Sequence, residues 1–410
     1  MNQLNIYEVN LRQYTPEGTI NAFIQHLPRL YDMGVEVLWM MPIYPIGVLN
    51  RKGTMGSYYS IKDFCDVNAE FGTREDFKVL VEKVHDYGMK LIIDWVANHA
   101  SWDNVWTKTN PDFFVKDGAG NFKSPYDWSD VIQIDHSSVS EQAAMLDAMK
   151  FWITEFNVDG FRADLAHLTP LSFWVNARKF LSTIKNDLIW LAETDEINYY
   201  DAFDIVYAWK WMHVTEAFFK EGKDINSLNS LLEKQNHDLT KDAVQLYFTS
   251  NHDENSWNGT EYEKYGIYAK ALAVFNYTYP NSIPLIYSGQ ELPNCQRLAF
   301  FEKDAIEWAG TIELHSFYKT LIAFHKNNFS AGELRFLPAQ KNMFAFIRQH
   351  EDRSVLVFLN FSREKLKVNY TVTGVSGNYQ NIFTGETVSL SEIITIELDP
   401  GSYLVLNKKN

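Results

Sequence analysis

The stretch Gly160-Phe161-Arg162-Ala163-Asp164 follows a helix-like segment, residues 140–156, and has the composition of a short β-strand. Side chains alternate between the two faces of a strand, so Arg162 and Asp164 are expected on the same face. A guanidinium beside a carboxylate lowers the pKa of the carboxyl group by roughly 1–3 units. The pair therefore predicts an ionised Asp164, and the pentapeptide alone leaves open whether it is a structural ion pair or a catalytic nucleophile.

Strand-like segments alternate with helix-like segments on both sides of this stretch. The expected strands are residues 6–11, 35–40, 90–94, 160–164, 188–193, 204–207, 245–248 and 283–287. The expected helices are residues 21–33, 73–87, 140–156, 173–184, 227–234, 262–275 and 315–325. Eight strand–helix units in one direction predict an α/β fold, a (β/α)8 TIM barrel, with functional residues where the strands end.

Two segments interrupt this alternation. Residues 98–136 are rich in Asp, Asn, Gly and Trp, and we expect a short inserted loop subdomain after the third strand. From residue 328 onward the helical patterns stop, and short strand-like runs separated by turns predict a C-terminal all-β sandwich. The predicted organisation is a catalytic barrel of residues 1–97 and 137–327, an insert of residues 98–136, and a β-sandwich of residues 328–410.

The composition of the 410 residues narrows the class of ligand. The formal net charge is −15, whereas binding to nucleic acid or to an anionic membrane requires clustered Lys and Arg. Aromatic residues make up 15% of the chain, and those outside the core can stack on the apolar face of a sugar. We therefore expect a neutral ligand, with no nucleic-acid partner and no membrane partner.

The location of the protein is less constrained. Cys65 and Cys295 are the two cysteines, and we expect free thiols without a metal or disulfide framework. No apolar run approaches the roughly 20 residues of a membrane span, and the first residues do not have the pattern of a signal peptide. These features fit a cytoplasmic protein or an exported one whose signal peptide is absent from this sequence. They do not indicate an oligomeric state.

Carboxylates stand at the ends of the third, fourth, fifth and seventh expected strands. Three of them, Asp164, Glu193 and Asp253, converge if the strands form a barrel. Retaining glycoside hydrolysis needs an ionised nucleophile and a proton donor about 5–5.5 Å apart. Glu193 follows the apolar run 188–192, so burial and neighbouring charges should raise its pKa and make it the proton donor.

These strand ends resemble the signatures of the α-amylase family, glycoside hydrolase family 13, in the family order. The matching segments are residues 94–99 (D-x-x-x-N-H), residues 160–164 (G-F-R-x-D), the strand end at Glu193, and residues 251–253 (N-H-D). Residues 59–64 are similar to the family's Tyr-x-x-x-Asp segment, and residues 289–291 also fit. The motifs span the barrel to about residue 325, while the β-rich end resembles the family's C-terminal domain only in position and composition.

The resemblance implies a role for each matching residue. It implies Asp164 as nucleophile, Glu193 as general acid/base and Asp253 as the carboxylate that holds the sugar hydroxyls and helps to distort the ring. It also implies four substrate-binding residues, namely Tyr59 stacking beneath the sugar, Arg162 orienting the nucleophile, and His99 and His252 as hydrogen-bonding groups. Asp94 is expected to stabilise the barrel mouth through the arginine.

The resemblance also raises the question of a structural calcium ion. In many members the counterpart of Asn98 is a calcium ligand, completed by acidic groups of the insert and by a backbone carbonyl after the nucleophile. Asp130 and Asp135 are the nearest candidates here, and neither is identifiable as a ligand from the sequence. No metal is needed for the chemistry, so we expect no catalytic cofactor. His167 stands where other members have lysine, and either a leaving-group contact or a structural role at a helix start fits.

The function expected from these residues is retaining hydrolysis of α-1,4 bonds in starch, glycogen or malto-oligosaccharides. Alternatives within the family are an α-glucanotransferase, an α-glucosidase and a cyclomaltodextrinase-like enzyme. Alternatives outside this chemistry are a non-enzymatic binding protein, which the three carboxylates disfavour, and a metal-dependent hydrolase using His99, Asp94 and Glu193. Aromatic residues expected to wall the cleft as a group are Trp102, Trp106, Phe113, Phe114, Tyr126, Trp128 and Trp257.

Overall fold

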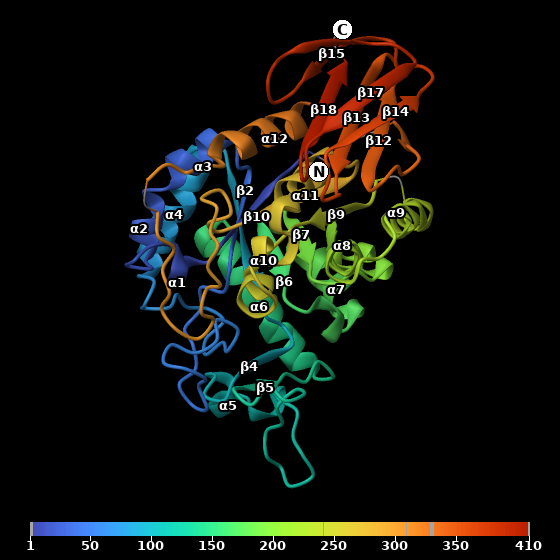
Figure 1. Ribbon diagram of the computed structural model, residues 1–410. Helices are drawn as coiled ribbons and strands as arrows, with labels where there is room; N and C mark the ends of the chain where they lie inside the picture. The colour runs from blue at the N-terminus through green and yellow to red at the C-terminus, as the bar shows by residue number, and fades with distance from the viewer. Residues whose placement is uncertain (1–2, 241, 309, 329–331, 409–410) are drawn as a thin grey trace.

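The computed structural model describes residues 3–240, 242–308, 310–328 and 332–408, and its centre is a closed barrel of eight parallel strands (Figure 1). The order around the barrel is β1-β10-β9-β8-β7-β6-β3-β2. The strands are β1 (Ile6–Val9), β2 (Val37–Met40), β3 (Lys90–Trp95), β6 (Gly160–Ala163), β7 (Ile189–Ala192), β8 (Ile205–Tyr207), β9 (Val244–Tyr247) and β10 (Ser282–Tyr287). The predicted TIM barrel is confirmed.

Helices surround the barrel on its outer side. They are α1 (Leu11–Tyr14), α2 (Ile20–Ile24), α3 (Leu27–Met33), α4 (Arg74–Asp86), α6 (Val139–Phe156), α7 (Leu171–Leu181), α8 (Trp209–Glu221), α9 (Asn226–Asp238), α10 (Glu261–Tyr265), α11 (Ala269–Thr278) and α12 (His315–Asn327). The helix expected at 21–33 is two helices, because the helical hydrogen bonding is interrupted at residues 25–26 and Pro28 lies in the first turn of α3. The helix expected at 262–275 is interrupted at Gly266, which has a φ of +54°. Helix α8 was not predicted.

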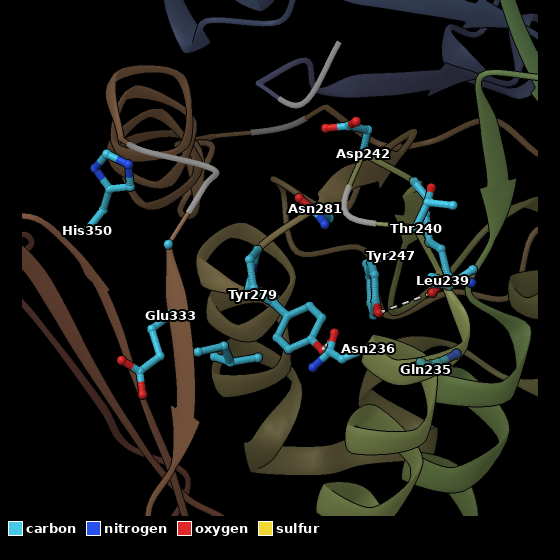
Figure 2. A pocket seen from close by; sticks show the side chains of 15 residues that line it. Gln235, Asn236, Leu239, Thr240, Asp242, Tyr247, Tyr279, Asn281, Glu333 and His350 are labelled. Carbon is cyan, nitrogen blue, oxygen red and sulfur yellow. Dashed lines mark hydrogen bonds between the residues drawn. The ribbon is translucent and has the colours of Figure 1, made fainter.

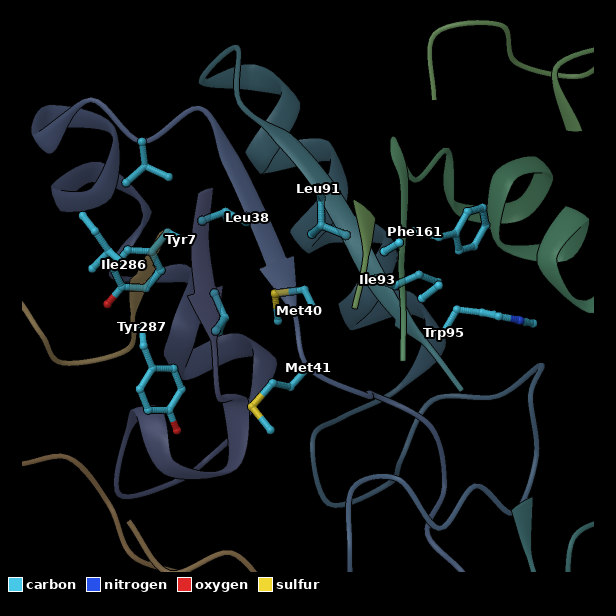
Figure 3. Packing of buried hydrophobic residues seen from close by; sticks show 14 of the residues in the cluster. Tyr7, Leu38, Met40, Met41, Leu91, Ile93, Trp95, Phe161, Ile286 and Tyr287 are labelled. Atoms are coloured by element: carbon cyan, nitrogen blue, oxygen red, sulfur yellow. The ribbon is translucent and has the colours of Figure 1, made fainter. Parts of the chain in front are cut away.

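Each barrel strand is buried on both faces, as expected for a parallel sheet covered by helices. Tyr7 and Leu38 point outward into the helix layer, where Leu91 and Phe161 join them (Figure 3). Their sequence neighbours pack in a separate cluster inside the barrel, which includes Ile6, Val37, Trp39, Ile92, Leu191 and Ile205. This alternation sends the side chains at even positions of β3 and β6, and at odd positions of β7, toward the barrel axis.

Gly160 allows β6 to pair closely with β7. Its φ is +152°, and a Cβ atom added there would lie 2.0 Å from the carbonyl oxygen of Ile189. Any side chain would therefore separate the two strands that carry Arg162 and lead to Glu193.

The insert forms a small layer of its own at the end of the barrel opposite the C-terminal sheets (Figure 1). It contains β4 (His99–Ser101), α5 (Trp106–Thr109), a 3-10 turn (Pro111–Phe113) and β5 (Val131–Gln133), and β4 pairs antiparallel with β5. The register places His99 opposite Gln133.

The C-terminal part is all-β, as predicted. Six antiparallel strands, in the order β11-β12-β13-β18-β15-β16, are accompanied by the two-stranded sheet β14-β17. The strands are β11 (Glu333–Phe336), β12 (Met343–His350), β13 (Arg353–Asn360), β14 (Leu366–Thr371), β15 (Gly377–Asn381), β16 (Thr387–Leu390), β17 (Ile393–Leu398) and β18 (Tyr403–Lys408). Phe358 of the larger sheet and Ile396 of the smaller one share a hydrophobic core. Residues 329–331, at the predicted domain boundary, lie outside the described residues. Across the part of the chain that is described, no helix combines the length and apolar character that a membrane span requires.

Candidate active site

A cavity of about 620 Å³ opens where the barrel strands end, within the range typical of small-molecule sites. Asp164 and Leu165 follow β6, Glu193 follows β7, and Asp253 begins a π-helical turn at 254–258 after β9. The remaining lining residues are Lys52, Ser57, Tyr59, His99, Asp127, Trp128, Asp130, Val131, Trp257, Phe300 and Phe301. The cavity thus brings together five of the seven residues assigned to catalysis or substrate binding.

Another cavity lies at the opposite ends of the strands, between α9 and β11 (Figure 2). It is lined by Gln245 at the start of β9 and by Tyr279, whose hydroxyl donates to Asn236 Oδ1 at 2.9 Å. None of the predicted site residues lines it. Functional residues of TIM barrels lie at the other face, so the cavity at the strand C-termini is the candidate active site.

Arg162 lies directly beneath this cavity and is completely buried. Its Nη1 donates to Asp94 Oδ1 at 2.8 Å and to Asp164 Oδ1 at 3.0 Å. Its Nη2 lies 2.9 Å from Glu193 Oε2. One guanidinium therefore compensates three carboxylates, and Asp94 belongs to the arginine network, as expected.

The shared arginine corrects one expectation about Asp164. Burial raises the pKa of Asp164 well above its usual range; Arg162 opposes this shift, and the charge of Glu193 adds to it. The prediction that the pKa of Asp164 is lowered was wrong, because burial of Asp164 outweighs the effect of Arg162, which also serves two other carboxylates. Burial also raises the pKa of Glu193, as predicted.

The hydrogen bonds of the two carboxyl groups differ, and the difference indicates how they can act. Asp164 Oδ2 is buried and has no hydrogen-bond partner among the described residues. Glu193 Oε2 accepts a hydrogen bond of 2.7 Å from the backbone N–H of Leu165. Leu165 adopts a left-handed conformation with a φ of +40°, which is strained for a leucine and typical of functional sites. No pattern in the sequence indicated this contact.

His252 lies behind Tyr59 and does not line the cavity. Its Nδ1 is 2.5 Å from Glu8 Oε1 and its Nε2 is 2.7 Å from the Tyr59 hydroxyl. Burial lowers the pKa of His252, but the charges of Asp253 and Glu8 outweigh this and raise it to about 9. The imidazole is therefore cationic at neutral pH, and both of its nitrogens already have protein partners.

Tyr59 forms the part of the cavity floor above this histidine. The two rings are stacked, with centroids 5.3 Å apart, and the Tyr59 hydroxyl also donates to Asp94 Oδ2 at 3.0 Å. The ring of Tyr59 is thus fixed from below, and its upper edge remains available to a ligand in the cavity.

His99 lines the insert side of the cavity as an uncharged imidazole. Burial lowers its pKa to about 4. Its Nδ1 is 3.3 Å from the Asn98 amide nitrogen, and its ring meets Trp128 edge-on with centroids 5.5 Å apart. Neutral His99 can therefore exchange hydrogen bonds with a neutral ligand.

The aromatic residues divide between the cavity and the core. Trp128 and Trp257 line the cavity, together with Phe300 and Phe301, which the sequence did not single out. Phe113 and Phe114 are buried, and Trp106 of the insert stacks on Phe64, which lies between β2 and α4. His167 is exposed and does not line the cavity.

Comparison with known proteins places this geometry in a family. The α-amylase catalytic-domain model matches residues 6–143 and 129–320, and the α-amylase C-terminal all-β domain model matches residues 335–409. The chain belongs to the α-amylase family. It is accordingly a glycoside hydrolase of that family, and the resemblance to the family is confirmed.

Solved structures of this family match along the whole chain. A maltogenic α-amylase from Thermotoga neapolitana is 30% identical with a TM-score of 0.91, over 100% of this chain and 99% of that one. An α-amylase from Lactobacillus plantarum is 26% identical with a TM-score of 0.91 over the same shares. Among curated proteins, a cyclomaltodextrinase from Bacillus sp. is 25% identical over 91% of this chain and 70% of its own length.

The calcium site that the α-amylase family suggests fits these residues poorly. The side-chain amide of Asn98 faces His99, and Asp130 Oδ1 forms an ion pair with Lys52 Nζ at 2.9 Å. Asp135 Oδ1 accepts from the backbone N–H of Ser137. Within the described ranges no three His, Cys, Asp or Glu side chains gather as a metal cluster. A cation at Asp130 would have to displace the Lys52 ammonium.

Proposed function

We propose that this protein is a retaining α-glucan hydrolase that cleaves α-1,4 bonds of starch, glycogen or malto-oligosaccharides. The supporting observation is that Asp164 and Glu193 share the guanidinium of Arg162 at one cavity, with Asp253 beside them. Two acids held on one fixed cation keep a constant relation to each other, which a double-displacement mechanism requires. The names of the T. neapolitana and L. plantarum relatives support an α-glucan as substrate.

In the first step Asp164 Oδ2 attacks the anomeric carbon of the bound sugar. Glu193 donates its proton to the glycosidic oxygen, so the bond to the leaving chain breaks as the bond to Asp164 forms. The raised pKa of Glu193 favours the protonated form that this step needs. Arg162 contacts both carboxyl groups and stabilises the negative charge that Asp164 must carry as nucleophile.

In the second step Glu193, now ionised, removes a proton from water, whose oxygen attacks the anomeric carbon and releases Asp164. Asp253 lies at the cavity surface, with Oδ2 3.4 Å from His252 Nε2, and we assign it to the sugar hydroxyls. Tyr59 supports the sugar ring and His99 contacts its hydroxyls. Arg162 and His252 act from below, through Asp164 and Tyr59 respectively.

Two variants test the assignment. Asp164→Asn and Glu193→Gln should each abolish hydrolysis of p-nitrophenyl malto-oligosaccharides while the far-UV and near-UV circular dichroism stays that of the parent. Lys365→Ala, in an exposed ion pair with Glu397 of the C-terminal sheets, is the control and should keep full activity. A normal turnover number in either carboxyl variant would refute the roles given to these residues.

A second candidate is a cyclomaltodextrinase-like activity, which the similarity to the Bacillus enzyme favours. Chromatography of the products from starch, pullulan, a cyclomaltodextrin and maltotriose separates the two. Hydrolysis of starch and maltotriose with little action on the ring supports the first proposal. Preferential opening of the ring supports the second, and transfer products at high acceptor concentration would identify a transferase.

A further inference from the structure

The loop of residues 46–58, which follows β2, is attached to the insert on one side of the cavity. The backbone N–H of Val48 donates to Asp103, and Lys52 Nζ reaches Asp130 Oδ1 at 2.9 Å. Gly47 packs so closely that an added Cβ would lie 2.2 Å from the Cβ of Ser101. The loop and the insert are therefore in direct contact at Gly47, and Lys52 and Asp130 line the cavity beside this contact.

The same loop is attached on its other side to the segment that follows β10. The backbone N–H of Thr54 donates to Glu302 Oε1 at 3.0 Å, and the N–H of Met55 donates to the Phe301 carbonyl at 3.0 Å. Gly53 has a φ of +63°, and an added Cβ would lie 2.5 Å from the Cβ of Phe301 and 2.9 Å from its carbonyl oxygen. The insert, the loop and the β10 segment therefore form one continuous wall.

Two arginines hold the loop in this shape. Arg51 donates from Nε to the Gly47 carbonyl at 2.8 Å and from Nη1 to the Thr54 carbonyl at 3.3 Å, closing the loop on itself. Arg12, which is 1% exposed, donates from below to the Gly56 carbonyl at 2.9 Å. Hydrogen bonds from a charged guanidinium to backbone carbonyls are among the stronger ones in proteins, so the wall is a fixed part of the barrel mouth.

The position of the wall relative to the proton donor Glu193 determines which end of the substrate lies against the wall. Around the barrel, β2 and β10 flank β1, and β7 stands diametrically opposite β1. The proton donor Glu193 follows β7, and the leaving part of the chain departs on the side of the proton donor. The sugars that stay on Asp164 therefore extend toward the wall formed after β2 and β10.

We propose that residues 46–58 close the glycone end of the cavity, so that the enzyme removes short units from the non-reducing ends of α-glucans instead of cutting internal bonds. This inference rests on the proposed function. The whole cavity has a volume of about 620 Å³, which holds only a few sugar rings. A bulky group on the terminal ring of the glycone would therefore meet residues 46–58.

A capped substrate tests this directly. Initial rates are measured on p-nitrophenyl maltoheptaoside and on the same compound with an ethylidene group across O4 and O6 of its non-reducing terminal sugar. Products are separated by chromatography. We expect the wild type to hydrolyse the capped compound at least about tenfold more slowly, a difference of ~1.4 kcal/mol in transition-state stabilisation. Equal rates on both compounds would show that residues 46–58 do not close the glycone end of the cavity, but would leave the proposed function intact. No hydrolysis of either would overturn the proposed function itself.

Variants of the wall should reduce this discrimination. Gly53→Ala forces the loop off Phe301, and the capped-to-free rate ratio should rise severalfold. Gly88→Ala is the matched control, because Gly88 has a φ of +70° and an added Cβ would have no heavy atom within 4 Å. An unchanged ratio in a folded Gly53→Ala enzyme would contradict the proposal.

A second pair of variants tests the wall even if Gly53→Ala does not fold. Lys52→Ala removes the side chain that spans to Asp130, and the capped-to-free ratio should again rise severalfold. Lys116→Ala, which removes the surface ion pair of 2.5 Å with Asp112 in the same insert, should leave the ratio at the wild-type value. A ratio that stays the same in Lys52→Ala would contradict the proposal.

Discussion

His252 gives a prediction whose size follows from the structure. Its folded pKa is about 9, against an ordinary value of 6.5, because Asp253 and Glu8 outweigh the effect of burial. A group whose pKa is raised on folding stabilises the protein fully below its unfolded pKa, and this contribution is lost as the pH rises through the folded pKa. The difference between the folded and the ordinary pKa of His252 corresponds to about 3 kcal/mol of unfolding free energy, which is lost between pH 6.5 and pH 9.

The variant His252→Gln isolates this contribution, because glutamine does not titrate. All 12 tryptophans lie before residue 309, so intrinsic fluorescence during urea unfolding reports on the barrel and the insert. Between pH 6.5 and pH 9 the wild type should lose about 3 kcal/mol more unfolding free energy than the variant. Parallel losses in the two proteins would show that His252 is not a buried cation, and would refute the pairing with Glu8.

Three further substitutions have distinct expected outcomes. Gly160→Ala should lower the unfolding free energy of the barrel by at least ~3 kcal/mol, because its Cβ would overlap the Ile189 carbonyl; tryptophan fluorescence in urea measures this, and wild-type stability would contradict the close pairing of β6 and β7. Arg162→Met should cost about 3–5 kcal/mol in the same assay by leaving three carboxylates without their cation, and an unchanged midpoint would contradict the shared ion pairs. Trp257→Ala should raise KM for maltoheptaose about two- to tenfold with little change in kcat. This is expected when about 0.5–1.5 kcal/mol of ring stacking is lost equally from the bound substrate and the transition state. Unchanged kinetics would show that this ring does not contact the substrate.

The fold could be read from the sequence because barrel strands are short, apolar and separated by helical patterns. Helix α8 was missed, although Trp211, Thr215 and Phe218 are buried at helical spacing. Its aromatic start at Trp209 has the composition of a strand edge, which obscured that spacing. The polar side chains at strand ends were easier to place, because a barrel brings all such ends to one face.

The sequence could not show what depends on pairs of residues from distant strands. Arg162 and Asp164 are two residues apart at the end of β6, whereas Asp94 and Glu193 come to the same guanidinium from β3 and β7. Burial at the barrel mouth, with the charges of Glu193 and Asp94 added, raises the pKa of Asp164 against the direction expected from its arginine alone. Lys52 lies in an irregular loop without periodicity, so nothing in its neighbourhood indicated a cavity wall.

In the proposed mechanism Asp164 forms a covalent bond to the sugar while Glu193 transfers the proton. The most direct measurement is mass spectrometry of the Glu193→Gln enzyme after incubation with α-maltosyl fluoride, whose leaving group needs no proton. We expect a mass increase of one maltosyl unit, located on the peptide that contains Asp164 and absent when Asp164→Asn is combined with Glu193→Gln. Failure to accumulate an adduct, or an adduct on another carboxylate, would contradict it.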